Sequence, residues 1–551
     1  MTTLRNFKTK RFSQRRISKK KLYKILTIIS ISILLFALSL YVKNLISEWY
    51  WKVHGAGFNW LHYEGTEVVR VWYLEAYSDA SYYYEPYLES FRYENWNPYA
   101  GGEGPLNGYA YGPMFIYGLY FVSLFVSSFF PQLDRPEMIV ESVKWTHIVF
   151  DALSVVMVYL IVITLKTFKE KTSTKHALGI YAAAIFSMMP INLLYVDSVF
   201  LNTPQMTFFT LISLLLFIKD KYKLTGFFLS VAWLSKQMPL FLLIPWFLII
   251  WKKIDLRAAF RDFLFPFLLS TLILSLPWLV MTPVEYTWRV FGPGKPLGFV
   301  DLEHLGYTVT LANSFLFLGN LSLTKFYFVL NKYMIPFLFF YGFTAVFAYF
   351  NGKKIGGNES YQIIFATWII INTHLFISRG IYKYYNAFIT PFVVLSLLTF
   401  IEEKSSNLIK RIKPKKFKHL SDVKMELSTD KENYTLTDNN RILFGIISTA
   451  FILVSALFYY FNCVIIAKSR YLHPLFLLIL FVVISLLLPP FIYLSIFDER
   501  NYKMIKTDVI YIYTQTKFGL KRAKSSFINV LIRFYNKLKQ GIIGIKKIFN
   551  K

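Results

Sequence analysis

The chain has one cysteine, Cys463, among its 551 residues. A single cysteine excludes an intramolecular disulfide bond and any metal cluster that needs several thiolates. Acidic residues are also scarce: the chain has 32 Asp and Glu compared with 61 Lys and Arg. No internal repeat of solenoid length is present. The inverted symmetry between two halves that is common in transporters is also missing, which weakly disfavours that class.

What the sequence has in abundance is apolar length. Hydrophobic residues make up 55% of the chain and aromatic residues 19%. Apolar runs of roughly twenty residues recur along it, and each is long enough to cross a bilayer as a helix. This pattern predicts an all-α polytopic membrane protein with about 11–13 membrane helices. We predict these helices near residues 22–42, 142–164, 178–196, 204–219, 224–236, 239–252, 261–281, 326–350, 359–377, 384–401, 441–463 and 474–496.

The basic residues collect beside the apolar runs. Residues 1–24 and 517–551 each hold ten Lys or Arg and no acid, whereas residues 43–110 hold nine acids and four bases. Such an asymmetry is the positive-inside signature of membrane proteins. It predicts anionic membrane lipids as partners of the basic ends and disfavours a nucleic-acid partner.

This charge distribution predicts the topology and the domain organisation. Residues 1–21 are a basic cytosolic N-terminus, and 22–401 form a catalytic membrane module whose first extracytoplasmic loop is 43–113. Residues 402–440 are a cytosolic linker, 441–498 hold C-terminal transmembrane helices, and 499–551 are a basic cytosolic tail.

The apolar stretch 114–130 affects the predicted topology. A simple crossing there would place the basic loop after residue 164 on the outside. We therefore predict an in-plane or re-entrant element, with a true crossing plus one extra pass as the alternative.

Three carboxylates are candidate catalytic groups: Asp79, Asp151 and Asp197. A carboxylate within hydrogen-bond reach of a hydroxyl is able to accept its proton. Asp151 stands inside an apolar helix, where a charge is costly and marks a functional site, although pairing with Lys144 or His147 is the structural alternative.

Several other polar residues are predicted to lie with these carboxylates on the extracytoplasmic face. Arg suits phosphate because its fork donates two parallel hydrogen bonds, and Lys supplies a compact charge. The alternative for the arginines is anchoring at lipid headgroups. The predicted substrate-binding residues are Glu85, Arg92, Tyr99, Asn202, Arg289, Arg379, Lys383 and Tyr384. No cofactor is required by this set, although paired carboxylates are able to admit a divalent metal.

Several segments, in order, resemble the GT-C glycosyltransferases, integral membrane enzymes that use a polyprenyl-phosphate-linked sugar. They are Asp79-Ala-Ser-Tyr82, Asn97-Pro98-Tyr99, Tyr109-Ala-Tyr111-Gly-Pro113, an acid early in the next helix at Asp151, the stretch Pro190 to Pro245 with its Lys-x-x-Pro, and SRGIYKYYNAFITP. The likeness covers roughly residues 20–400. Two departures stand out: Phe200-Leu-Asn202-Thr-Pro204 replaces a Trp-Gly-Gln-x-Asp pattern, and Tyr382-Lys383-Tyr384 lacks a His-Glu pair.

The resemblance implies a GT-C-type helix bundle with a large first extracytoplasmic loop. It implies Asp79 as the base and inversion at the anomeric carbon, with Asp151 and Asp197 in supporting roles. The implied donor is a dolichyl- or undecaprenyl-phosphate mannose or glucose, and the acceptor is a lipid-linked or cell-surface glycan. The expected location is the cell membrane, or the endoplasmic reticulum in a eukaryote.

A flippase or transporter of polyprenyl-linked glycans is the alternative, since it would share the lipid-facing cavity and the basic groups for phosphate.

Overall fold

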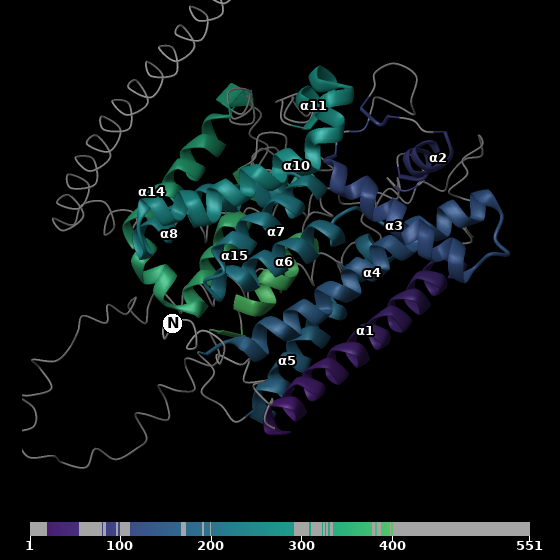
Figure 1. Cartoon of the computed structure of the whole chain (residues 1–551), viewed down its shortest axis with the longest axis horizontal. Coiled ribbons are helices and arrows are strands. Elements are labelled where there is room, and N and C mark those ends of the chain that lie inside the picture. The colour runs from purple at the N-terminus through teal and green to yellow at the C-terminus, as the bar shows by residue number, and fades with distance from the viewer. Residues whose placement is uncertain are drawn as a thin grey trace, which may run out of the picture. The chain divides into compact units, whose positions relative to one another are not determined.

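A computed structural model describes the helical core of the chain (Figure 1). The described residues are 19–53, 80, 84–94, 97–99, 109, 111–166, 172–189, 192–198, 200–290, 308–309, 322, 325–326, 329–330, 334–376, 381–382, 387–396 and 398–399. The chain divides into two compact units, Met1–Leu486 and Leu487–Lys551, and every described residue belongs to the first. The predicted linker, C-terminal helices and basic tail lie outside the described residues.

The first two long helices run antiparallel. Helix α1 spans Lys19–Val53 and α4 spans Arg135–Thr164. Glu48 pairs with Lys144 at 3.8 Å near the end of α1 and the start of α4, and Lys43 pairs with Asp151 deeper in the two helices. Figure 1 shows the two helices side by side. We call the end that holds Lys43 and Asp151 the site end of the bundle.

The chain then crosses the bundle repeatedly. Helix α5 (Thr172–Ser187) returns along α4, where the Tyr159 hydroxyl and His176 Nδ1 lie 2.8 Å apart. At the site end it continues into η3 (Asn192–Ser198). The elements that follow are α6 (Pro204–Ile218), α7 (Tyr222–Ser235), η4 (Met238–Leu242), α8 (Leu243–Lys253), α9 (Leu256–Ala258), η5 (Ala259–Leu264), α10 (Phe265–Met281) and α11 (Pro283–Val290).

The later helices close the bundle. Helix α14 (Ile335–Gly357) packs parallel to α8, with the Tyr341 hydroxyl donating to the Phe241 carbonyl at 3.2 Å and Trp251 against Tyr349. Helix α15 (Glu359–Phe376) runs back, and residues 387–396 form a further helical segment. Two short strands, β1 (Thr308–Val309) and β2 (Ile381–Tyr382), pair antiparallel.

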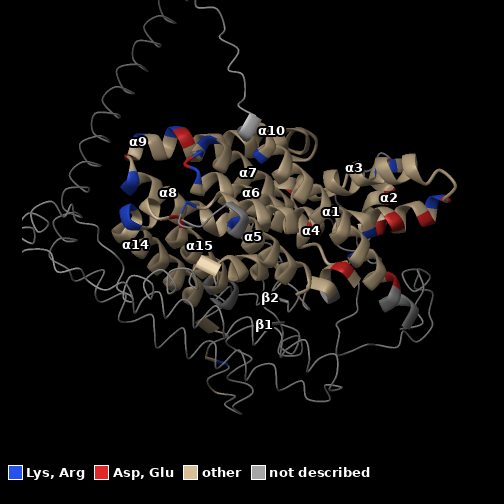
Figure 2. Ribbon diagram, turned by 90° about the horizontal axis from the view of Figure 1, so that it is seen from below, with Lys and Arg blue, Asp and Glu red and all other residues tan. Residues whose placement is uncertain are grey.

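At the end opposite the site end, one lysine joins the ends of three helices. Lys219, which follows α6, pairs with Glu359 of α15 at 3.1 Å and also donates to the Thr164 carbonyl of α4. Figure 2 shows further Lys and Arg residues gathered around α8, α9 and α14. We call this end the basic end.

Helix α3 (Pro113–Phe129) packs along the first half of α4, with Phe115 near its start against the His147 ring, and its first turns also meet the ends of three other helices. Gly112, just before α3, meets the Leu234 backbone at the end of α7. Gly118 meets Gln205 at the start of α6, and the Trp278 ring nitrogen near the end of α10 donates to the Tyr117 hydroxyl at 3.0 Å. The short stretch from Gly112 to Gly118 thus reaches the site ends of α6, α7 and α10. Whether 114–130 is an in-plane element or a true crossing stays a prediction.

The small helix α2 (Glu85–Tyr93) covers α3 and the start of α4. Arg92 fixes it by donating to the Ser123 carbonyl at 2.8 Å and to the Ser127 hydroxyl at 3.0 Å. The segment before α4 therefore forms a cover over the site end, built from α2 and α3.

Within the described residues, four helices are long and apolar enough to cross a membrane: Leu22–Glu48, Arg135–Thr164, Leu256–Met281 and Ile335–Gly357. Shorter apolar helices occupy Pro113–Phe129, Pro204–Ile218, Glu359–Ile371 and Ala387–Ser396. The helical architecture agrees with the predicted all-α membrane class, while the finer GT-C arrangement stays a prediction.

One helix boundary differs from the sequence prediction in a way that bears on the site. The predicted first helix stops at residue 42, before Lys43 and Asn44, whereas α1 continues to Val53. The extension is stable because Lys43 is fully buried against two carboxylates, so its charge does not end the helix. Helical structure therefore continues into the first part of the predicted first extracytoplasmic loop, 43–113.

Close packing of α7 on η5 makes a testable prediction. A Cβ on Gly226 would lie 2.3 Å from the Phe263 carbonyl oxygen. We expect Gly226→Ala to destabilise the protein by about 1–3 kcal/mol, because backbone must move to admit the methyl group. Thermal unfolding in detergent, followed by tryptophan fluorescence, measures this.

Gly342→Ala in α14 is the matched control, since a Cβ on Gly342 would meet no other atom within 4 Å. Equal melting temperatures for the two variants would contradict the close packing.

Candidate functional site

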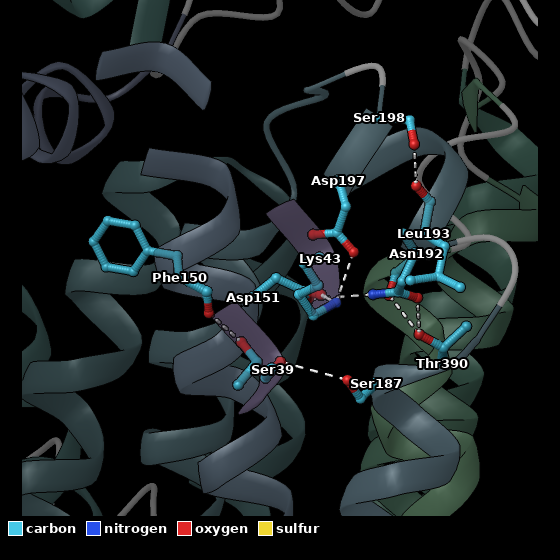
Figure 3. Close-up of polar contacts among 12 residues, drawn as sticks. Ser39, Lys43, Phe150, Asp151, Ser187, Asn192, Leu193, Asp197, Ser198 and Thr390 are labelled. Atoms are coloured by element: carbon cyan, nitrogen blue, oxygen red, sulfur yellow. Dashed lines mark hydrogen bonds and ion pairs between the residues drawn. The ribbon is translucent and has the colours of Figure 1, made fainter. Parts of the chain in front are cut away.

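The centre of the site end is a buried ammonium held between two carboxylates. Lys43 of α1 donates to Asp151 Oδ2 of α4 and, at 2.6 Å, to Asp197 Oδ2 of η3 (Figure 3). All three side chains are essentially excluded from solvent, with exposures of 0%, 1% and 0% for Lys43, Asp151 and Asp197. We call these residues the Lys43 cluster.

The Lys43 cluster continues into a fourth segment. The Asn192 amide nitrogen donates to Asp151 Oδ1 at 3.3 Å. Asn192 Oδ1 in turn accepts from the Thr390 hydroxyl at 2.7 Å. This chain of hydrogen bonds ties α1, α4, η3 and the helical segment 387–396 together (Figure 3).

The bonding pattern indicates what the two carboxylates do. Asp151 uses both oxygens and Asp197 uses Oδ2, whereas Asp197 Oδ1 is buried with no hydrogen-bond partner among the described residues. A carboxylate with both oxygens occupied is suited to fixing neighbouring segments in place, because a base needs a free oxygen facing the proton that it removes. The geometry therefore favours an orienting role for Asp151, whereas Asp197 both binds Lys43 and keeps one oxygen free.

A second polar cluster lies at the same end. Lys236, at the end of α7, donates to Asn202 Oδ1, and both residues are buried. The Lys236 ammonium also lies 5.9 Å from the centre of the Tyr111 ring. Asn202 is a predicted substrate-binding residue, and Lys236 belongs to the Lys-x-x-Pro element.

His147, one turn before Asp151 on α4, packs against the cover. Its Nδ1 lies 2.8 Å from the Val143 carbonyl, and its ring stacks on Tyr84 with centroids 5.7 Å apart. Tyr84 and Ala80, close in sequence to Asp79, are both fully buried. Ala80 and Tyr84, which precede α2, are thus packed into the site end.

The remaining predicted residues of the cover have defined places. Tyr99 is fully buried, and its hydroxyl donates to the Tyr111 carbonyl at 2.8 Å. Burial raises the pKa of Tyr99, so its phenol stays neutral. Arg92 is engaged with α3. Glu85 is 6% exposed, and its Oε1 has no hydrogen-bond partner. Burial, with a smaller contribution from Glu89, raises the pKa of Glu85 to about 8.

Arg289 lies on α11 beyond the end of α10. Its Nη1 is buried without a hydrogen-bond partner in the described structure, and Tyr286, one turn earlier, packs against Tyr99 with ring centroids 4.7 Å apart. Arg289 is thus near the cover. Asp79, Arg379, Lys383 and Tyr384 lie outside the described residues, so their predicted roles stay predictions.

The sequence alone did not identify Lys43, the residue at the centre of the site. Lys43 ends the most apolar run of the chain, and its position suggested only a helix boundary. The available signal was that an ionisable side chain next to or within a membrane helix needs a partner of opposite charge. The partners of Asp151 proposed from sequence were Lys144 and His147, whereas Lys144 pairs with Glu141 and Glu48 instead.

Metal ligands are sparse in this part of the molecule. Among the described residues, no group of three or more His, Cys, Asp or Glu side chains is placed to hold a metal ion. Between Asp151 and Asp197 the Lys43 ammonium takes the position that a divalent cation would need.

No protein-family model matches the sequence, and no curated protein is significantly similar to it.

The Lys43 cluster predicts a charge-dependent loss of stability. Lys43→Met leaves two buried carboxylates without their cation, which we expect to cost about 3–5 kcal/mol of unfolding free energy. Adding Asp151→Asn and Asp197→Asn removes the uncompensated charge and should restore much of the loss. Melting temperature in detergent reports both effects.

Lys24→Met, on the exposed face of the same helix, serves as the control and should change little. If the triple variant melts below Lys43→Met, charge compensation is not what stabilises the cluster.

The Glu85 carboxyl predicts a pH effect on stability. Its pKa rises from 4.5 to about 8 on folding, so the folded state holds a proton that the unfolded state releases. Stability should be full below pH 4.5 and fall by about 1.4 kcal/mol per pH unit up to pH 8. Glu85→Gln cannot ionise, so its melting temperature should match wild type near pH 5 and exceed it at pH 8.

Glu94→Gln controls for loss of a nearby exposed acid, because Glu94 and its partner Arg135 both lie at the surface and Glu94 does not contribute to the raised pKa of Glu85. A constant difference between Glu85→Gln and wild type across this pH range would refute the assignment.

Proposed function

We propose that this protein is a GT-C-type membrane glycosyltransferase, which transfers mannose or glucose from a polyprenyl-phosphate-linked donor to a lipid-linked or cell-surface glycan. The single observation that supports it most is that three segments of the GT-C resemblance meet at the site end. Asp151 and Asp197 share the Lys43 ammonium, and Lys236 of the Lys-x-x-Pro element lies beside Tyr111 of the Tyr-x-Tyr-x-Pro element.

The charge distribution supports an extracytoplasmic active site. Basic residues surround the end opposite the site end, and positive charge near membrane helices favours the cytosolic side. In this orientation the cover formed by α2 and α3 faces away from the cytosol. A lipid-linked sugar would reach the site from the outer leaflet.

The proposed chemistry is a direct displacement at the anomeric carbon. An acceptor hydroxyl oxygen forms the new bond to that carbon while the bond to the phosphate oxygen breaks. The electron pair leaves with the polyprenyl phosphate, and the hydroxyl proton passes to the Asp79 carboxylate. Attack from the face opposite the leaving group inverts the configuration.

Two further sets of residues have supporting parts in the proposal. Arg289, Arg379 and Lys383 would stabilise the negative charge on the leaving phosphate. Asp151 and Asp197 would orient the segments around the substrate through Lys43. Glu85, Arg92, Tyr99, Asn202 and Tyr384 complete the proposed substrate-binding set. No step requires a cofactor.

The test is turnover by purified protein in liposomes with a panel of polyprenyl-phosphate sugars, with and without divalent metal, read by product mass. Asp79→Asn should lower turnover by about 10²-fold or more, because a positioned proton acceptor contributes on that scale. Glu285→Gln, an exposed acid on α11, is the control and should keep wild-type turnover.

A flippase predicts a different outcome. Transport of a fluorescent polyprenyl-linked glycan across the bilayer that persists in Asp79→Asn, with no sugar transfer by wild type to any acceptor, would reject the enzyme in favour of a transporter.

A further inference from the structure

The second polar cluster at the site end indicates what kind of ligand the protein recognises. Its members contact one another in a closed circuit: His147 stacks on Tyr84, Tyr84 lies edge-on to Tyr111 at 6.1 Å, and the Lys236 ammonium lies over Tyr111. Lys236 bonds Asn202, and Phe200, two residues before it, lies 6.2 Å from His147 between ring centres. We call these residues the His147–Asn202 cluster.

His147 presents a buried hydrogen-bond acceptor. The Val143 carbonyl can only accept, so the 2.8 Å contact requires His147 Nδ1 to carry the proton. In the neutral ring, Nε2 is then a lone-pair acceptor. Nε2 is buried and has no hydrogen-bond partner in the part of the chain that the structure describes.

Asn202 presents a buried donor in the same cluster. An ammonium group only donates, so the amide atom facing Lys236 must be the oxygen, as the structure has it. This fixes the orientation of the amide and turns its nitrogen away from Lys236. That nitrogen, Nδ2, is also buried, and no described residue is its hydrogen-bond partner.

A free acceptor and a free donor next to aromatic rings define which ligand groups would fit this cluster. Buried polar atoms are nearly always satisfied, so each of these atoms calls for a partner. An ionised phosphate offers acceptors only and would leave His147 Nε2 unmet. A hydroxyl donates and accepts, and a sugar ring adds an apolar face that packs against aromatic side chains.

From this complementarity we propose that the His147–Asn202 cluster binds the hydroxyl groups of the hexose, separately from the cations that would hold the lipid phosphate. The inference rests on the proposed function for the identity of the ligand. It does not depend on catalysis, because a site that recognises the sugar would do so before any bond is broken.

The experiment compares lipids that differ only in the sugar. Wild-type protein in nanodiscs is titrated with decaprenyl-phosphate mannose, decaprenyl-phosphate glucose and bare decaprenyl phosphate, and affinities are read by native mass spectrometry. We expect wild type to bind at least one sugar-bearing lipid more tightly than the bare lipid. The ratio of the two affinities measures recognition of the sugar alone.

Two variants test the two atoms. His147→Phe keeps an aromatic ring against Tyr84 and removes the acceptor. Asn202→Asp keeps an oxygen for Lys236 and removes the donor, and any effect of its charge on the phosphate is common to both lipids. Each variant should reduce the affinity ratio roughly 3- to 10-fold, the usual scale for one neutral hydrogen bond.

Gln362→Ala is the matched control. Gln362 is a buried amide on α15 that also has one unpartnered atom, and it bonds the Gly356 carbonyl toward the basic end. Its variant should leave the ratio unchanged.

The outcomes separate this inference from the proposed function. If wild type does not prefer the sugar-bearing lipid, or if both variants keep the wild-type ratio, the cluster holds water or serves packing alone and the inference is overturned. Sugar-dependent binding that both variants reduce, together with no sugar transfer by wild type, supports the inference while rejecting the transferase.

Discussion

A buried ammonium between two buried carboxylates constrains the whole site end of this protein. Removing three charged groups from water costs free energy that only close mutual contact offsets. Lys43, Asp151 and Asp197 come from three elements, so α1, α4 and η3 must meet at one place for the chain to fold. Asn192 and Thr390 extend the same requirement to a segment almost two hundred residues further along.

This constraint determines what surrounds it. Because η3 is tied to α1 and α4, the short connection that follows brings Asn202 to the start of α6, where Lys236 reaches it from the end of α7. Helix α3 lies over the ends of α6, α7 and α10, and α2 is fixed upon it by Arg92. The site end is therefore assembled from a fixed base, the Lys43 cluster, and a cover that packs mainly through aromatic side chains.

The two polar clusters differ in chemical character. In the Lys43 cluster, strong ionic contacts and one amide hydrogen bond occupy three carboxylate oxygens, which suits the positioning of backbone segments. In the His147–Asn202 cluster, one neutral acceptor and one neutral donor beside aromatic rings have no hydrogen-bond partner among the described residues. The contacts that hold the helices together and the atoms that we propose for sugar recognition thus belong to different residues.

The sequence by itself determined the helical membrane class and the approximate location of most described helices, because apolar length and flanking charge are local properties. It also singled out Asp151, Asp197 and Asn202, since a polar group in apolar surroundings is conspicuous along the chain. Only the tertiary structure decided that α1 runs past Lys43, that Lys43 is the partner of both acids, and that the start of α3 meets the ends of α6, α7 and α10. Each of these depends on distances between segments remote in sequence, and hydropathy carries no information about which buried charges will meet.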